Sequence, residues 1–454
     1  MLQNTLSIPH GSTRAISLAD SYYLFNPDSL RVYEADKKVL PKDVIDGCRH
    51  YVEKTDLPLK LVQHFQHVFP SEPCFDRGTE LQEKFYVIVF LTDTCNLRCV
   101  YCYQQDFIKT EGMTSKTADH LVSWILSHDQ PKNCDVPLHV IFFGGEPLLN
   151  RKSLDQVASS ISEQTKYLRP SFFISTNGTL LDEQNADLLA KHNVRMQVSI
   201  DGYKEVQDKN RPLANGSGSY DLVCSNLRHP SIDISSLTGR ITVTKHSLDF
   251  YENAVHLYNL GFRQIAVGFC VHGGAGNEIC EEDMPSIRRN LQKLWTFYLA
   301  RISEGDSLKI TPFYDHLLLL SLRQPPPSCG AGRNVFAINS DGDILPCPRF
   351  SGGEMYSCGN VRTQMDKKRV RDIQSLPSFS LKKPKECRSC WVRNLCSAPC
   401  RFFSSPGPQQ EAQSTLCSII EIQWETCLSA FITARQCGIS IVNTILKTAE
   451  DRAS

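Results

Sequence analysis

Three cysteines separated by short gaps share one segment of this chain. Cys95, Cys99 and Cys102 have the spacing CxxxCxxC and follow the apolar, strand-like run Phe85–Leu91. Three thiolates can ligate three irons of a [4Fe–4S] cluster and leave the fourth iron open to another molecule, whereas four cysteine ligands would close the cluster. The alternative is a structural zinc site, which usually needs a fourth cysteine or histidine nearby. The pattern therefore favours an iron–sulfur centre with an open iron that does chemistry.

A second set of cysteines occupies the last third of the chain. Four of them have the spacing Cx2Cx5Cx3C, and the others flank this group. The set consists of Cys329, Cys347, Cys387, Cys390, Cys396, Cys400 and Cys417. The chain has 19 cysteines, and metal ligation explains them better than disulfides, which are rare in a reducing cytoplasm. A zinc ribbon is the alternative, because paired Cys-x-x-Cys also suits tetrahedral zinc.

Charge and hydropathy argue against several classes of protein. Lysine plus arginine equals aspartate plus glutamate at 49 each, so no net field favours nucleic acid or an anionic membrane. The most apolar runs fall far short of the ~20 residues that cross a bilayer. The segment from Met1 to Arg14 lacks the pattern of a secretory signal. We therefore expect a cytoplasmic protein with no nucleic-acid or membrane partner, whose binding depends on a defined pocket.

The elements that must position the first cysteine set alternate regularly. Six strand-like runs are Phe85–Leu91, Leu138–Phe143, Phe172–Ser175, Met196–Ile200, Ile241–Thr244 and Gln264–Phe269. Helix-like stretches lie between them, and such alternation predicts a parallel β/α barrel or part of one. In such barrels, functional residues collect on the loops that follow the strands.

Other elements flank this predicted barrel. Two β-like runs, Tyr22–Phe25 and Leu30–Tyr33, predict a hairpin that helices follow. Three consecutive prolines at 325–327 mark a boundary before the second cysteine set. A helical tail is expected from about Cys417 to Leu446.

The loop from Cys95 to Cys102, with an aromatic residue before its last cysteine, resembles the cluster loop of radical S-adenosylmethionine enzymes. The resemblance implies that the open iron chelates the amino and carboxylate groups of S-adenosyl-L-methionine (SAM). It also implies that an electron then cleaves SAM to a 5′-deoxyadenosyl radical, which abstracts hydrogen from the substrate. Three further segments look like segments of this family: Gly144-Gly145-Glu146-Pro147, Ser175-Thr176-Asn177-Gly178 and Ser199-Ile200-Asp201-Gly202.

The resemblance implies a set of cofactor contacts in and after these segments. The set consists of Gly144, Gly145, Glu146, Asn177, Ser199 and Arg211. The glycines would let the backbone approach the cofactor, and Glu146 would compensate its ammonium group. Arg211 would pair with its carboxylate. The alternative for Asn177 and Ser199 is turn capping, and the alternative for Arg211 is a surface ion pair.

The second cysteine set resembles the SPASM extension of these enzymes, which implies two auxiliary [4Fe–4S] clusters and three clusters in all. By this resemblance, the outer auxiliary cluster takes Cys387, Cys390, Cys396 and Cys417. The inner one takes Cys329, Cys347 and Cys400, and is one ligand short. Cys358 is the expected fourth ligand. The alternatives are an iron left open for a substrate thiolate and a buried cysteine that ligates nothing.

Together these observations predict an α/β protein whose main part is a partial parallel (β/α)6 barrel over 83–322. A cysteine-rich SPASM domain covers 323–425, and a helical tail covers 426–454. Residues 1–82 are expected to form a small α+β module. Two interpretations of this module stay open: a winged-helix-like module that recognises a leader peptide by β-augmentation, and an extension that caps the barrel.

The cysteine-rich part looks most like that of maturases of ribosomally made peptides. This implies an oxidoreductase that installs a thioether or carbon–carbon crosslink in a precursor peptide, with an external electron donor such as flavodoxin or ferredoxin. Oxidation of a cysteine or serine in a protein, as by sulfatase maturases, is one alternative. Those relatives usually place an aspartate base after the cysteine that matches Cys347, where this chain has Pro348. An iron–sulfur electron carrier or regulator is the non-enzyme alternative, and no catalytic base is assigned.

Overall fold

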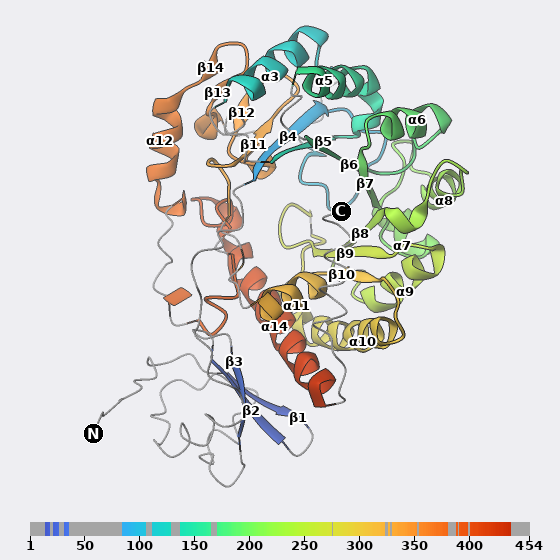
Figure 1. Cartoon of the computed structure of the whole chain (residues 1–454), viewed down its shortest axis with the longest axis vertical. Helices are drawn as coiled ribbons and strands as arrows, with labels where there is room; N and C mark the ends of the chain where they lie inside the picture. Colours follow the sequence, from blue (N-terminus) through green and yellow to red (C-terminus); the bar gives the residue numbers. More distant parts are fainter. Residues whose placement is uncertain are drawn as a thin grey trace.

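The computed structural model describes most of the chain from residue 84 onward and three short strands before it. The described residues are 14–18, 21–26, 31–35, 84–105, 111–128, 137–164, 170–274, 276–322, 326, 329–351, 354–379, 387–388, 390–397 and 400–436. They form the predicted α/β protein, in which helices surround a largely parallel sheet (Figure 1).

The main sheet has nine strands in the order β10-β9-β8-β7-β6-β5-β4-β11-β12. The strands are β4 (Phe85–Thr92), β5 (Leu138–Gly144), β6 (Ser171–Thr176), β7 (Arg195–Ser199), β8 (Thr238–Val243), β9 (Gln264–Phe269), β10 (Lys309–Thr311), β11 (Val335–Ile338) and β12 (Ile344–Leu345). All neighbours are parallel except β11 and β12. The six predicted strands are confirmed as β4 to β9. β10, β11 and β12 extend the sheet at its two ends.

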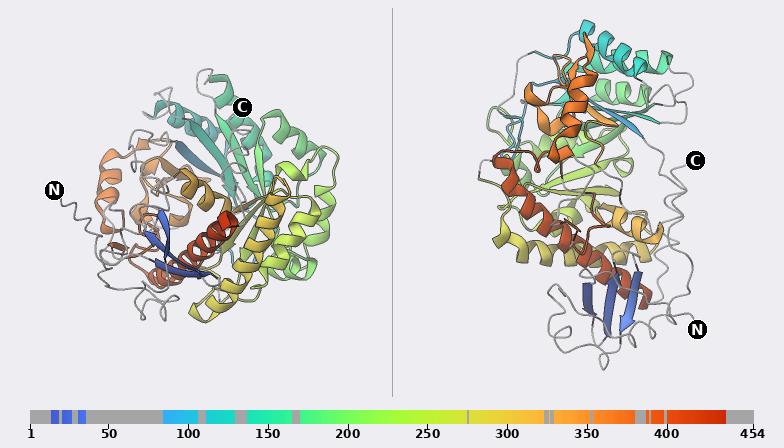
Figure 2. Two further views of the ribbon diagram at one scale, coloured as in Figure 1. Left: turned by 60° about the horizontal axis from the view of Figure 1, so that its bottom comes forward. Right: turned by 90° about the vertical axis from the view of Figure 1, so that its left-hand side faces the viewer.

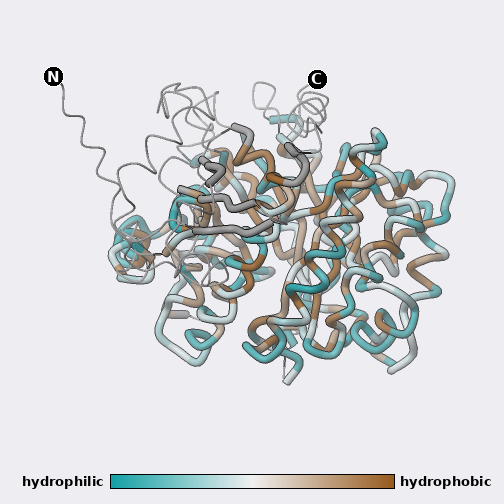
Figure 3. Tube along the Cα trace, turned by 90° about the horizontal axis from the view of Figure 1, so that it is seen from below, coloured by the Kyte–Doolittle hydropathy of each residue, from teal (hydrophilic) through white to brown (hydrophobic). Residues whose placement is uncertain are grey.

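Helices follow most of the strands. The α-helices are α3 (Ser115–Ser127), α5 (Arg151–Gln164), α6 (Glu183–Lys191), α7 (Lys204–Asn210), α8 (Tyr220–Leu227), α9 (Phe250–Leu260), α10 (Met284–Ser303), α11 (Phe313–Leu322), α12 (Lys367–Ser375) and α14 (Ala412–Gln436). Short 3-10 helices are η2 (Pro147–Asn150), η3 (Ile234–Ser236), η4 (Glu281–Asp283), η5 (Pro348–Phe350), η6 (Glu354–Tyr356), η7 (Pro377–Phe379) and η8 (Pro408–Glu411). Along the peripheral helices, hydrophilic and hydrophobic residues alternate, as expected for elements with one face on the core (Figure 3).

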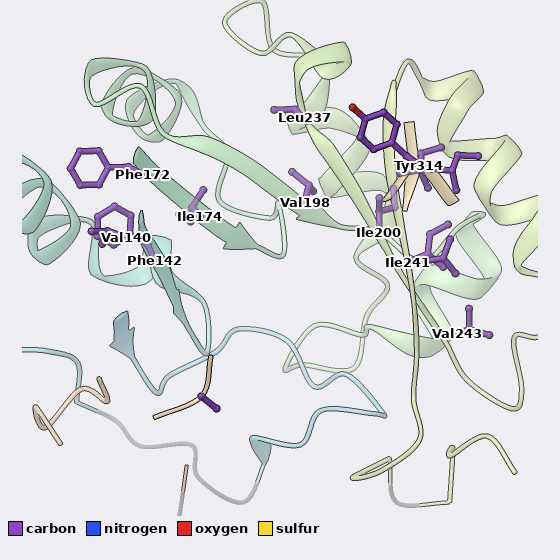
Figure 4. Close-up of a cluster of buried hydrophobic side chains, with 14 of the residues drawn as sticks. Val140, Phe142, Phe172, Ile174, Val198, Ile200, Leu237, Ile241, Val243 and Tyr314 are labelled. Atoms are coloured by element: carbon purple, nitrogen blue, oxygen red, sulfur yellow. The ribbon is translucent and has the colours of Figure 1, made fainter. Parts of the chain in front are cut away.

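The core lies between the strands and the surrounding helices. Along β5, the buried side chains Leu138, Val140 and Phe142 alternate with half-buried ones, because successive residues of a strand point to opposite faces. Figure 4 shows Val140 and Phe142 clustered with Phe172 and Ile174 of β6. The other face of each strand points to the inside of the partial barrel. Its residues are therefore available for a site.

Aromatic rings fill the amino end of this inner face. Tyr86 of β4 stacks on His139 of β5 with ring centroids 4.8 Å apart, and His139 lies 5.6 Å from Phe173 of β6. The guanidinium of Arg195, at the start of β7, lies 5.3 Å from the Phe173 ring. Polar residues of the inner face, such as Gln197 and Ser199, come later in β7. Because the amino end of the inner face is filled by aromatic rings and polar residues lie toward the carboxyl end, the carboxyl end of the sheet is the one suited to chemistry.

The cysteine-rich region is continuous with the main sheet. β11 pairs in parallel with β4, so Phe336 lies opposite Val87. The Phe336 ring is buried, and its centroid lies 6.2 Å from that of Phe85 and 6.1 Å from that of Trp124. A two-strand hairpin follows, formed by β13 (Gly359–Asn360) and β14 (Gln364–Met365).

The long helix α14 packs across the outside of the barrel on α10 and α11 (Figure 2). His316 of α11 stacks on Trp424 with ring centroids 3.8 Å apart, and Arg288 of α10 forms a 2.9 Å ion pair with Glu425. The predicted tail helix is therefore present, although it begins at Ala412 and is described only to Gln436. No helix in the described part of the chain is long and apolar enough to span a membrane.

Three strands precede the barrel as a separate antiparallel sheet: β1 (Arg14–Leu18), β2 (Ser21–Asn26) and β3 (Arg31–Ala35). The predicted hairpin is confirmed as β2 and β3, with Phe25 opposite Val32. Phe25 is fully buried and meets Trp391 of the cysteine-rich region edge-on, with ring centroids 6.2 Å apart. The helices expected after the hairpin, and with them the winged-helix interpretation, lie outside the described residues.

Replacement of Phe336 by alanine tests the junction between β11 and β4. Phe336→Ala removes a buried ring that touches aromatic residues of two elements, so we expect the free energy of unfolding to fall by about 3–5 kcal/mol. Urea unfolding followed by tryptophan fluorescence measures this change, because Trp124 lies beside the ring. Leu376→Ala, at a position that is 37% exposed, is the control and should change it by less than about 0.5 kcal/mol. Equal effects of the two variants would contradict the prediction.

Candidate active site

The cysteines of the first set lie on the loop after β4, at the carboxyl edge of the parallel sheet. Cys99 is buried, Cys95 and Cys102 are half-buried, and all three are free thiols. Burial raises the pKa of each thiol, that of Cys99 to about 12, while the positive charge of Arg211 acts in the opposite direction. Each of the three also interacts electrostatically with at least one of the others. The structure therefore brings the three predicted ligands together beside a buried cation.

Hydrogen bonds from β6 fix the start of this loop. The Asn177 amide Nδ2 donates to Asn96 Oδ1 at 2.8 Å and lies 4.0 Å from Cys95 Sγ. Asn96 Nδ2 donates to Thr179 Oγ1 at 2.8 Å, and Thr179 N donates back to Asn177 Oδ1 at 2.9 Å. Leu97 N points at Cys95 Sγ, 3.4 Å away. Asn177 thus orients the cysteine loop through its hydrogen bond to Asn96, the residue next to Cys95. This role does not depend on a contact between Asn177 and a cofactor.

The glycine pair after β5 lies directly against the segment that leads to Cys95. Gly145 N donates to Thr92 O at 2.8 Å, and Glu146 N donates to Thr94 O at 2.9 Å. A Cβ atom on Gly144 would lie 2.2 Å from Thr92 O, and one on Gly145 would lie 2.2 Å from Thr94 O. Only glycine permits this approach. The two glycines are therefore required by the cysteine segment itself, and their contact with a cofactor stays a prediction.

Glu146 is fully buried and joins the ends of two strands. Its carboxylate accepts hydrogen bonds from Thr176 Oγ1 at 2.7 Å, from Asn177 N at 2.7 Å and from Leu148 N at 3.2 Å. Burial raises the pKa of this carboxyl group, and these donors, with the charge of Arg211, act to lower it. The predicted role as partner of an ammonium group would add to this structural role.

Arg211 belongs to a buried chain of polar groups rather than to the surface. Its Nη1 donates to the Tyr101 hydroxyl at 2.6 Å, and that hydroxyl donates to Asp201 Oδ2 at 2.8 Å. Asp201 also accepts from Thr242 N at 2.9 Å and from Asn210 Nδ2 at 3.2 Å. Burial alone would lower the pKa of Arg211, but the thiol, phenol and carboxyl groups around it raise it above its usual value.

Two hydrogen-bond donors in this region have no partner among the described residues. One is the buried Nε of Arg211, and the other is the hydroxyl of Ser199, which ends β7 in a half-buried position. Both residues were predicted to contact SAM. Their spare donors suit the carboxylate of that cofactor, so the residues present fit the group.

The cysteines assigned to the inner auxiliary cluster come together. Cys347 interacts electrostatically with Cys400 and Cys329, and burial raises its pKa to about 12. The thiol of Cys358 has no electrostatic interaction with these three cysteines. It is fully buried, its thiol lies 3.8 Å from Tyr356 O, and Arg369 is the charged group that acts on it. The expected role of Cys358 as fourth ligand therefore stays a prediction that this position does not favour.

The cysteines assigned to the outer cluster are all half-buried: Cys387, Cys390, Cys396 and Cys417. Cys417 lies on α14, where Gln413 Nε2 is 3.3 Å from its sulfur. Among the described residues, no three Cys, His, Asp or Glu side chains already surround one metal position. The ligand sets of the clusters thus stay predictions.

Sequence reasoning missed a contact between the two cysteine regions. Tyr103 follows Cys102, Arg349 follows Cys347 by two residues, and the guanidinium of Arg349 lies 5.5 Å from the Tyr103 ring. It also lies 5.0 Å from the ring of Phe403. The only available signal was an aromatic and a basic residue beside cysteines, which is common. The contact joins the loop of the first set to that of the inner auxiliary set.

Comparison with known proteins agrees with this architecture. Residues 89–247 match the family model of the radical SAM superfamily, and residues 329–391 match that of SPASM, an iron–sulfur cluster-binding domain. The chain therefore contains a radical SAM domain and a SPASM domain. The first domain implies SAM and one [4Fe–4S] cluster, and the second implies further iron–sulfur binding.

Among its relatives is a cysteine-type anaerobic sulfatase-maturating enzyme of Clostridium novyi, 26% identical over 337 residues, which are 69% of this chain and 87% of the relative. The mycofactocin maturase MftC of Mycobacterium ulcerans is 26% identical over 370 residues, 78% of this chain and 90% of the relative. The enzyme is thus similar to maturases of more than one kind.

Two solved structures share the fold. Native anSMEcpe with bound AdoMet has a TM-score of 0.61 and 19% identity, and the match covers 76% of this chain and 98% of that one. Streptococcus suis SuiB bound to the precursor peptide SuiA has a TM-score of 0.51 and 17% identity, over 89% of this chain and 99% of that one.

Gly145→Ala tests the contact between the glycine pair and the cysteine segment. The added methyl group would displace the backbone at Thr94, so we expect less iron at the first cluster and a rate of SAM cleavage lowered about 100-fold. Iron analysis and quantification of 5′-deoxyadenosine after anaerobic reconstitution measure both. Leu222→Ala, on α8 at a position that is 41% exposed, is the control. Normal iron content and normal turnover in Gly145→Ala would refute the conclusion that the cysteine segment requires a glycine at this position.

Tyr101→Phe tests the chain that holds Arg211. The variant removes the acceptor of the Arg211 Nη1 hydrogen bond, so the guanidinium is no longer fixed in place. We expect the Kd for SAM to rise about tenfold, equivalent to ~1.4 kcal/mol. Equilibrium binding of SAM to the reconstituted protein measures this. Tyr251→Phe removes a hydroxyl that makes no hydrogen bond within the described structure and serves as the control. An unchanged Kd in Tyr101→Phe would exclude Arg211 as a partner of the cofactor.

Proposed function

We propose that this enzyme is a peptide maturase that oxidatively installs a crosslink, either a thioether or a carbon–carbon bond, in a ribosomally made precursor peptide. The observation that carries the proposal is the contact of Arg349 with Tyr103. It joins the cysteine loop of the radical SAM domain to a cysteine loop of the SPASM domain, so that radical formation and removal of an electron take place side by side. The likeness to a mycofactocin maturase and to the fold of a peptide-bound enzyme supports a peptide substrate.

The chain's own residues have distinct roles in this proposal. Cys95, Cys99 and Cys102 hold the first cluster, which with SAM supplies the 5′-deoxyadenosyl radical when bound. Arg211 and Ser199 hold the cofactor's carboxylate through their spare donors. Asn177 keeps the cysteine loop in place through Asn96. This fixed geometry is what directs the abstraction to one hydrogen of the peptide.

We further propose two auxiliary [4Fe–4S] clusters, three clusters in all. Cys387, Cys390, Cys396 and Cys417 hold the outer one, and Cys329, Cys347 and Cys400 hold the inner one. The lack of an electrostatic interaction between Cys358 and this trio supports the alternative in which a substrate thiolate completes the inner set. An external donor such as flavodoxin or ferredoxin would reduce the enzyme, in the cytoplasm.

Oxidation of a cysteine or serine in a protein is the second candidate. Sulfatase-maturating relatives support it, including the one from Clostridium novyi. The chain has Pro348 where those enzymes usually have an aspartate base, and the next side chain is the cation Arg349. A crosslink removes two hydrogens, whereas oxidation of cysteine to an aldehyde also replaces sulfur by oxygen, so mass measurement of a co-expressed peptide distinguishes these two products. Oxidation of serine also removes only two hydrogens, and reaction of the peptide with a hydrazine, which an aldehyde gives and a crosslink does not, distinguishes that case.

SAM cleavage tests the enzymatic part of the proposal. The reconstituted protein with a strong reductant should form 5′-deoxyadenosine, and replacement of Cys95, Cys99 and Cys102 by alanine should abolish it while leaving the absorbance of the auxiliary clusters. Replacement of Cys224, Cys280 and Cys427, which no proposed cluster uses, is the matched control and should preserve turnover. No 5′-deoxyadenosine from protein with intact clusters would favour the electron carrier instead.

A further inference from the structure

Arg240 is a charged residue on the inner face of the partial barrel. It lies on β8, where the buried Gly239 and Ile241 on either side point to the surrounding helices and Arg240 is half-buried on the opposite face. It pairs in register with Ser199 of β7. Its guanidinium lies over the backbone of β9, because a Cβ on Gly268 would be 2.0 Å from Nη2. The positive charge is thus inside the barrel, near its carboxyl edge.

Among the described residues, no acidic group pairs with this guanidinium. Arg240 makes no side-chain hydrogen bond or ion pair in the described part of the chain. The acidic groups that act on it at longer range are those of Tyr101 and Asp201. Both are already engaged, since Tyr101 lies between Arg211 and Asp201, and Asp201 accepts three hydrogen bonds. The charge of Arg240 therefore lacks a counter-ion close by.

A second unpaired guanidinium lies on the facing segment. Arg349 of η5 is half-buried, and its described contacts are the faces of Tyr103 and Phe403. The Tyr103 ring under Arg349 belongs to a residue that packs just after β9, because a Cβ on Gly273 would lie 2.9 Å from Tyr103 Cβ, and Arg240 covers Gly268 of the same strand. The charge of Arg349 also acts on Arg240. Arg240 comes from the radical SAM domain and Arg349 from the loop of the inner auxiliary cysteines. The two cations therefore lie toward the same end of β9, on segments that come from the two domains.

Such a pair is unfavourable without an anion. Two like charges in a partly desolvated space repel each other, and each loses hydration that no carboxylate replaces. Other partly buried arginines of this chain do have acidic partners, such as Arg263 with Asp306 at 3.6 Å and Arg288 with Glu425 at 2.9 Å. Glutamine at either position would keep the polarity without the repulsion. An anion from outside the chain that binds between the two guanidinium groups would remove the repulsion, and this explains why both charges are present.

We propose that Arg240 and Arg349 together bind a carboxylate of the peptide substrate, so that the modified residue lies beside an acidic side chain or beside the peptide's carboxyl terminus. This inference rests on the proposed peptide-maturase function and names the recognition element of its substrate. Arginine suits the role because its planar guanidinium binds a carboxylate with two parallel hydrogen bonds. Both arginines are positioning residues, which hold the substrate rather than react with it.

Three matched peptides test the inference on the full-length, reconstituted enzyme with SAM. The first is acetylated and amidated with a central glutamate, the second has glutamine instead, and the third has glutamine and a free carboxyl terminus. We expect the glutamate peptide or the free-carboxyl peptide to bind about tenfold more tightly than the neutral one in calorimetric titration, as for one charge-assisted interaction. Which of the two is preferred identifies the source of the carboxylate.

Variants assign the preference to the two arginines. Arg240→Gln and Arg349→Gln should each abolish the difference between charged and neutral peptides, without changing the Kd for SAM. Arg195→Gln is the matched control, because it removes a charge from the opposite end of the same inner face and should preserve the preference. Iron content and circular dichroism check that each variant retains its clusters and fold.

The outcomes separate this inference from the proposed function. No preference in the wild-type enzyme, or a preference that survives both arginine variants, would overturn it. Weaker SAM binding in Arg240→Gln with an intact peptide preference would also overturn it, by assigning Arg240 to the cofactor. If the wild type forms 5′-deoxyadenosine but shows no preference, only the carboxylate site fails. If the preference holds and no 5′-deoxyadenosine forms, only the proposed function fails.

Discussion

The backbone contact between the end of β5 and the segment after β4 is the constraint on which the site depends. Gly145 and Glu146 donate hydrogen bonds to Thr92 O and Thr94 O. The carboxylate of Glu146 then holds the end of β6, and Asn177 of that end holds Asn96 in the cysteine loop. Three neighbouring strand ends are thereby tied into one unit. A loop with three thiols needs this rigidity, since its sulfurs must lie at the corners of one cluster.

The part of the fold that follows local patterns could be predicted from the sequence. Six runs of apolar residues became β4 to β9, because each combines a strand-length apolar stretch with a helix before the next one. β10 has three residues and β12 has two, which are too short to show a period. β11 was missed for a different reason. Its partner β4 lies about 250 positions earlier in the chain, and no local pattern indicates such pairing.

The candidate site, like the fold, was predicted from the sequence only where local spacing indicates it. Spacing alone indicated the cysteines, because thiol ligands on one loop must be close in sequence. Spacing did not indicate that Glu146 is bonded to three donors, or that Arg211 lies in a buried chain with Tyr101. It also did not point to Arg240 or Arg349. A single arginine in a strand or a loop is ordinary, and these two have meaning only because the fold brings unpaired charges from two domains together.

The pairing of β11 with β4 has a consequence for how the protein is made. β4 is among the first barrel strands to leave the ribosome, but one of its two neighbours is synthesised almost last. During that interval β4 presents an unpaired edge, the kind of surface at which strands of different chains associate. The nascent barrel thus has to remain separate from other copies until the cysteine-rich region arrives. The SPASM region thus contributes β11, which covers the free edge of β4, in addition to forming a domain of its own.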